Sequence, residues 1–181
     1  MAPVAFGVDL AKSVDWTVIV GLDPIGRVCR FDRFQAPWKE TIARVRSAVG
    51  GYHALVDSTG VGDPILEELQ RPGVSFNNFE GYKFTAQSKQ QLMEGLAVAI
   101  QNRKIRFPDG TIRLELENFE YEYTGVGGRS TGVRYSAPQG SNDDAVCALA
   151  LAWSAFAEAG QPISGLSTGS LMGSTKRPDW A

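Results

Sequence analysis

The 181-residue sequence is poor in the side chains on which many hydrolases and extracellular proteins depend. It contains one histidine, His53, and two cysteines, Cys29 and Cys147, which lie far apart and form no CxxC motif. Two distant cysteines exclude a zinc knuckle and a disulfide framework and indicate reduced thiols in an intracellular protein. One histidine excludes an HExxH zinc site and leaves only His53 for a Ser-His-Asp triad or a Cys-His pair. We therefore expect any hydrolytic chemistry to depend on carboxylates.

Long apolar runs and an excess of one charge are also missing. No run approaches 18 apolar residues, which predicts no transmembrane helix, and the start of the chain lacks the pattern of a signal peptide. Eighteen basic and twenty acidic residues give a net charge of −2, so nucleic acid would have to be bound by a local patch. The composition predicts one globular domain over 1–160, followed by a flexible tail, 161–181, rich in Gly, Ser and Thr.

The order of the predicted elements indicates an α/β domain. Three apolar segments with short turns between them, 4–10, 16–21 and 27–34, predict an antiparallel meander. Helices and strands then alternate, and a meander followed by right-handed crossovers gives a mixed sheet with helices on both faces, as in the ribonuclease H-like fold. The later elements are predicted as helix 37–49, strand 53–57, helix 63–70, strand 74–82, helix 85–102, a β-hairpin of 113–123 and 130–137, and a buried apolar helix over 143–158.

Acidic residues stand where this topology brings elements together. Asp9 ends the first strand and Asp57 the fourth, and these strands would be parallel neighbours. Asp143 and Asp144 lie in the first turn of the last helix. An acid at the end of an apolar strand is costly unless it is paired or bound to a cation, and the carboxyl ends of parallel strands are where ligand sites form. Converging carboxylates therefore predict a site for two Mg²⁺ or Mn²⁺ ions that hydrolyses a phosphodiester.

Each acid also has a simpler interpretation. Asp143 could interact with the helix dipole, and Asp57 could begin a turn before Ser-Thr-Gly. Asp63 competes with Asp57 for the second carboxylate, although its place before Pro64 is typical of a helix cap. His53 is interpreted as a structural strand histidine. The order and topology of the acids, taken together, favour the metal site.

Basic residues are concentrated in one part of the sequence. Between Arg71 and Arg113 there are seven basic residues and three acids. Some of these side chains are expected to follow a phosphate backbone. The candidate nucleic-acid-binding residues are Lys12, Lys83, Lys89, Arg103, Lys104, Arg129 and Arg134.

Four segments resemble, in order, the C-terminal nuclease domain of the large terminase subunit of tailed double-stranded DNA bacteriophages. They are GVDLAKSVDWTVIVGLD (7–23), ALVDSTGVGDPILEEL (54–69), FTAQSKQQLMEGLAVAIQNRKI (84–105) and NDDAVCALALAW (142–153). The resemblance implies a metal-dependent endonuclease that cuts viral DNA during genome packaging in the host-cell cytoplasm. It makes Asp9, Asp57 and Asp143 the acids of the first, second and third motifs, with Asp144 as a further metal ligand.

Members of this family also carry an N-terminal packaging ATPase domain. The sequence has no GxxxxGK[ST] motif, and Asp9 leaves no room for such a domain before it, so we expect the chain to be the nuclease domain of a longer protein. The resemblance implies double-stranded DNA, the small terminase subunit and the portal protein as partners, and no membrane.

Other functions remain as alternatives. Holliday-junction resolvases and integrase-type nucleases share the fold and would differ in their substrate. Actin-like phosphotransferases share the core of the fold, and the segments DLAKS and DSTGVGD resemble their phosphate loops, but 181 residues are few for the two domains they need. A binding module with an inactive site is the remaining alternative.

Overall fold

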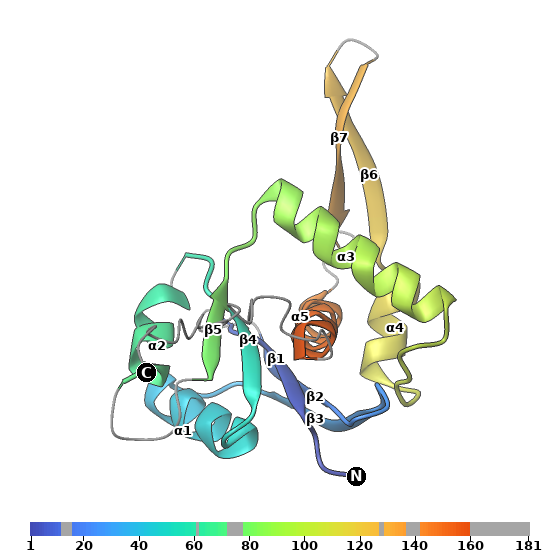
Figure 1. Ribbon diagram of the computed structural model, residues 1–181. Helices are drawn as coiled ribbons and strands as arrows, with labels where there is room; N and C mark the ends of the chain where they lie inside the picture. Colours follow the sequence, from blue (N-terminus) through green and yellow to red (C-terminus); the bar gives the residue numbers. More distant parts are fainter. Residues whose placement is uncertain (12–15, 61, 72–77, 127–128, 137–141, 160–181) are drawn as a thin grey trace, which may run out of the picture.

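The computed structural model describes residues 1–11, 16–60, 62–71, 78–126, 129–136 and 142–159, with the backbone alone for the hairpin residues 120–126 and 129–136. These residues form a five-stranded mixed sheet with helices on both faces and a separate two-stranded hairpin (Figure 1). The expected tail, 161–181, and the candidate Lys12 lie outside the described residues.

The sheet has the strand order β3-β2-β1-β4-β5. Strands β1 (Ala5–Asp9), β2 (Thr17–Leu22) and β3 (Val28–Phe34) form the antiparallel meander that the sequence predicts. Strands β4 (His53–Asp57) and β5 (Phe79–Tyr82) then extend the sheet in parallel with β1. The predicted mixed sheet is confirmed.

Helices cover the two faces of the sheet unequally. Helices α1 (Trp38–Val49) and α2 (Gly62–Leu69) lie on one face, and α5 (Asp144–Ala159) lies across β1, β2 and β4 on the other (Figure 1). Helices α3 (Ala86–Gln101) and α4 (Thr111–Glu117) pack on the outer side of α5, which is therefore buried on nearly all sides. Among the described helices, none combines the length and the apolar character needed to cross a membrane.

Small residues allow α5 to lie directly on β1. A Cβ atom at Gly7 would overlap the carbonyl oxygen of Ala148 and the amide nitrogen of Ala152. The alanines of α5 thus bring its backbone close to the strand that ends at Asp9. This contact agrees with the buried, alanine-rich helix expected from the sequence.

The first strand of the predicted hairpin begins later than expected. The alternation of Ile112, Leu114 and Leu116 with charged residues predicts that the hairpin opens at residue 113, but 111–117 form helix α4. Arg113 is held by ion pairs four residues away on each side, to Asp109 at 2.7 Å and Glu117 at 2.8 Å, which support a helix but not a strand. The hairpin strands are β6 (Glu120–Val126) and β7 (Arg129–Ser136). Strand β5 begins at Phe79 rather than at residue 74, and 74–77 lie outside the described residues.

Candidate active site at the carboxyl ends of β1 and β4

The register of β1 and β4 brings the first two acids side by side. Val8 is level with Val56 in the parallel pair, so Asp9 and Asp57 follow at the same edge of the sheet. Side chains alternate along a strand, which puts Asp9 on the same face as Gly7 and Asp57 on the same face as Leu55. Because Gly7 and Leu55 pack on the α5 side, both acids face the first turn of that helix.

The third and fourth acids come from the start of α5. The carbonyl oxygen of Asp143 accepts a hydrogen bond from the amide of Cys147 at 2.9 Å, and Asp144 is the first residue of the helix. Burial, followed by the charges of Asp57, Asp144 and Asp143, raises the pKa of Asp9 well above its ordinary value of 3.8. Three carboxylates from two other elements therefore act electrostatically on Asp9 at this edge.

Asp57 is oriented by the backbone that follows it. Its Oδ1 accepts a hydrogen bond from the amide of Thr59 at 2.8 Å, the turn geometry expected of an aspartate before Ser-Thr-Gly. Thr59 in turn accepts a hydrogen bond at Oγ1 from the amide of Phe84 at 2.8 Å, which connects this turn to the start of α3. Burial raises the pKa of Asp57, and the hydrogen bonds from Thr59 act against this rise.

Lys89, a candidate for binding nucleic acid, lies among the acids. Its Nζ is 2.8 Å from Oδ2 of Asp143, with side chains that are 24% and 26% exposed. Burial alone would lower the pKa of Lys89, but interactions with Cys147, Asp143 and Asp9 outweigh burial and raise it. In this structure Lys89 is thus the counter-ion of Asp143.

The other candidate residues lie away from this cluster or outside what is described. Lys83 makes an exposed ion pair of 2.9 Å with Asp63, the rival for the second carboxylate, at the start of α2. Arg103 and Lys104 are exposed beyond the end of α3, about 20 Å along the helix from Lys89. Arg129 and Arg134 lie on β7, where the side chains are outside the described part of the chain.

Glu115 is a buried residue of the site that the sequence did not predict. Its Oε2 accepts a hydrogen bond from the amide of Ala145 at 2.7 Å, and its Oε1 lies 3.6 Å from Arg33. Burial raises its pKa, and the nearby charge of Asp144 contributes to the rise. Glu115 thereby fixes the first turn of α5. A helical interpretation of 111–117 would have placed it, with Ile112, on the buried face.

The chemistry of these donors suits hard divalent cations. All four aspartates offer carboxylate oxygens, which Mg²⁺ and Mn²⁺ prefer, and the mutual repulsion at Asp9 is the charge pattern that a cation would relieve. Among the described residues, however, the ligand atoms that all lie within 4.8 Å of one another belong to a different group, His53, Glu80 and Glu158. The four aspartates do not form such a group, and one of them, Asp143, is ion-paired with Lys89.

Known proteins with similar sequences are large terminase subunits of phages. No protein-family model matches the chain. The large terminase subunits of Thermus virus P23-45 and of Thermus phage G20c are each 34% identical to it over 156 residues. These matches cover 83% of this chain but 31% of each relative, so the chain spans about a third of their length.

Solved structures give the same family. The large terminase nuclease of the thermophilic phage G20c superposes with a TM-score of 0.71 at 30% identity, over 83% of this chain and 80% of that one. The same nuclease with bound magnesium has a TM-score of 0.71 at 31% identity, and with bound cobalt 0.69 at 32% identity, each covering 83% of this chain and 79% of that one. The fold is therefore ribonuclease H-like, and the chain belongs to the nuclease domains of the phage large terminase family.

Proposed function

We propose that this chain is a metal-dependent endonuclease that cuts double-stranded viral DNA during genome packaging. The observation that carries the proposal is the meeting of Asp9, Asp57, Asp143 and Asp144 at one edge of the sheet, in a fold shared with the G20c nuclease. The binding of magnesium and cobalt by that relative supports a divalent cation as cofactor.

In this proposal the four aspartates hold two cations, Mg²⁺ or Mn²⁺. A pair of such ions supplies a hydroxide-like nucleophile at neutral pH and neutralises the charge that develops on a phosphodiester. Asp9, whose pKa responds to the charges of the other three acids, would be one of the ligands. The Thr59 amide holds Asp57 in one orientation, and the Glu115 carboxylate holds the first turn of α5, from which Asp143 and Asp144 project.

Lys89 has a different role in this site. Its ammonium group compensates the carboxylates in the metal-free protein through its ion pair with Asp143. Cations bound by the aspartates would compete with that ion pair, leaving Lys89 available to a DNA phosphate. DNA contacts away from the cluster are assigned to Lys12, Lys83, Arg103, Lys104, Arg129 and Arg134.

The test is cleavage of supercoiled plasmid by the purified chain in Mg²⁺, Mn²⁺ or EDTA. We expect nicking and linearisation with either metal, loss of both in EDTA, and a fall of at least a hundredfold for Asp9→Asn and Asp143→Asn. Asp63→Asn is the matched control, because it removes an exposed aspartate that is paired with Lys83 away from the cluster, and it should retain activity.

Two results would contradict the proposal. Full activity of Asp9→Asn would show that the cluster is not catalytic, and cleavage of four-way junctions in strong preference to linear duplex would favour a junction resolvase. We further propose that the chain acts in the host-cell cytoplasm within a longer protein that carries the packaging ATPase. The small terminase subunit and the portal protein would be its partners there.

A further inference from the structure

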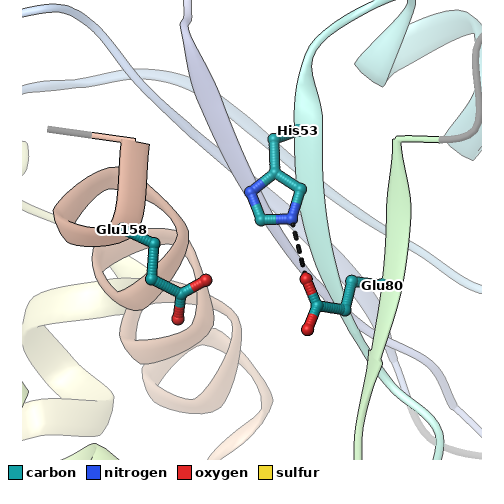
Figure 2. Close-up of side chains that lie close together, drawn as sticks. All are labelled: His53, Glu80 and Glu158. Atoms are coloured by element: carbon teal, nitrogen blue, oxygen red, sulfur yellow. Dashed lines mark hydrogen bonds and ion pairs between the residues drawn. The ribbon is translucent and has the colours of Figure 1, made fainter. Parts of the chain in front are cut away.

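We infer that the chain has a second divalent-metal site, formed by His53, Glu80 and Glu158, at the end of the sheet opposite the aspartates. One ligand atom from each residue lies within 4.8 Å of the other two. Figure 2 shows the three side chains converging from β4, β5 and the last turn of α5. This site would take a borderline transition-metal ion of the Zn²⁺ class, because imidazole nitrogen is a poor ligand for Mg²⁺.

The topology explains why two sites occur on one face. His53 begins β4 and Asp57 ends it, so the two residues share a face and are about 13 Å apart. Helix α5 runs in the opposite direction, with Asp144 at its start and Glu158 near its end. Glu80 is next to Leu55 in the parallel β4–β5 pair and so also faces α5. The aspartates therefore lie at one end of the contact between β4 and α5, and the second group of possible ligands lies at the other end.

The distances suit a metal ion after a small movement. Nε2 of His53 lies 3.2 Å from Oε2 of Glu80, which is close to the ligand–ligand spacing of about 3.3 Å in a tetrahedral zinc site with bonds near 2.0 Å. Glu158 accepts a hydrogen bond from the hydroxyl of Ser154 at 3.1 Å, which orients its carboxylate from the preceding turn of the helix. Exposed positions on both glutamates leave room for water to complete the coordination.

The charges provide a second, independent argument. The last turn of α5 carries Glu158 and no basic residue, although acids at a helix C-terminus are disfavoured by the helix dipole. Glu80 adds another carboxylate beside it. A bound dication would neutralise both carboxylates and join the end of α5 to β4 and β5. The simpler alternative is an ion pair between His53 and Glu80 without any metal.

The single histidine of the sequence makes the test selective. In the full, tag-free chain labelled with ¹³C-histidine, the two imidazole cross-peaks report on His53 alone. ZnCl₂ is titrated in the presence of excess MgCl₂, which would compete with zinc for the proposed aspartate site. We expect the cross-peaks to shift and to saturate at one equivalent of zinc. Glu80→Gln and Glu158→Gln should each weaken binding at least tenfold, whereas Glu67→Gln, an exposed glutamate of α2, should leave it unchanged.

The alternatives give different results. Imidazole peaks that do not shift at a tenfold excess of zinc would contradict the proposed metal site. His53 and Glu80 would then form an ion pair without a metal. Peaks that shift equally in the wild type, Glu80→Gln and Glu158→Gln would mean that His53 binds zinc alone, which also contradicts the proposed site. Equilibrium dialysis provides the second readout, since His53→Asn should lose one bound zinc per chain. Neither measurement depends on nuclease activity, so the site stands or falls separately from the proposed function.

Discussion

Among the four aspartates, Asp9 has the carboxylate whose negative charge most destabilises the metal-free fold. Its pKa is raised well above 3.8 by burial and by three neighbouring acids, so at neutral pH the charged form destabilises the metal-free fold. We predict that Asp9→Asn raises the free energy of unfolding by ~1–2 kcal/mol in EDTA at pH 7, the size of a close repulsive charge contact. Chemical denaturation measures this gain, and a lower stability than wild type would indicate a structural role for Asp9.

The same residue predicts how stability depends on pH. An acid whose pKa is raised on folding binds its proton more tightly in the folded state, so folding becomes more favourable as the pH falls through the raised value towards 3.8. Metal-free wild type should therefore gain stability relative to Asp9→Asn over this range, and the difference between the two proteins should shrink. A difference in stability that stays constant with pH would contradict the raised pKa of Asp9.

Removing the charge of Lys89 should lower the stability of the metal-free protein, whereas removing the charge of Asp9 should raise it. Its ion pair with Asp143 is largely buried, so Lys89→Met leaves the acids without their counter-ion and should lower the free energy of unfolding in EDTA by ~1–3 kcal/mol. Mg²⁺ should restore most of this loss, because cations replace the missing positive charge. Lys83→Met is the control, since its exposed pair with Asp63 is worth ~0.5 kcal/mol or less. Equal losses for the two variants would contradict a special role for Lys89.

At the scale of the element, the position of the acids depends on how closely α5 lies on β1. A methyl group at Gly7 would meet the backbone of Ala148 and Ala152, which cannot move aside as a side chain can. We predict that Gly7→Ala costs ~2–4 kcal/mol and separates Asp9 from Asp143 and Asp144, with loss of metal binding. Thermal unfolding and calorimetric titration with Mg²⁺ measure the two effects.

Gly95 provides the matched control for that substitution. It lies inside α3, and a Cβ atom there would meet nothing within 4 Å. Gly95→Ala should therefore raise stability by ~0.5–1 kcal/mol through helix propensity alone. If Gly7→Ala were equally harmless, the close approach of α5 to β1 would not be what aligns the acids.

The elements also show what the sequence could and could not predict. The β1–β4 pairing followed from the order of the predicted elements, and the meeting of Asp9 and Asp57 followed from the acids at the ends of those two strands. Helix α4 was not predicted, because Ile112, Leu114 and Leu116 alternate with charged residues as in a strand. In the helix, Leu114 is 60% exposed, so the apolar residues do not all lie on one buried face. The Glu115 contact with α5 was missed with it. The pairing of Lys89 with Asp143 joins residues 54 positions apart, and no local pattern predicts such a contact.

For the molecule as a whole, the net charge does not favour DNA binding, and the hairpin is the candidate for a local DNA-binding element. Strands β6 and β7 form their own sheet and project from the body beyond α3 (Figure 1). The net charge of −2 gives the molecule no general attraction for DNA. Seven residues of the sequence lie between the end of β7 and the start of α5, and Asp143 is the last of them. We propose that this projecting arm helps to hold a DNA duplex on the body.

Trimming the hairpin tests this idea on the intact body. Tyr121 and Tyr135 are cross-strand partners, so a short Gly-Ser turn could replace 122–134 without straining the base. We expect thermal unfolding of the body to be unchanged and duplex binding to fall, with the salt dependence less steep by ~0.9 for each DNA phosphate that the trimmed protein no longer neutralises. Arg129→Gln combined with Arg134→Gln in the intact hairpin should reproduce both changes. Unaltered binding of the trimmed protein at every salt concentration would instead mean that DNA is held by the body alone.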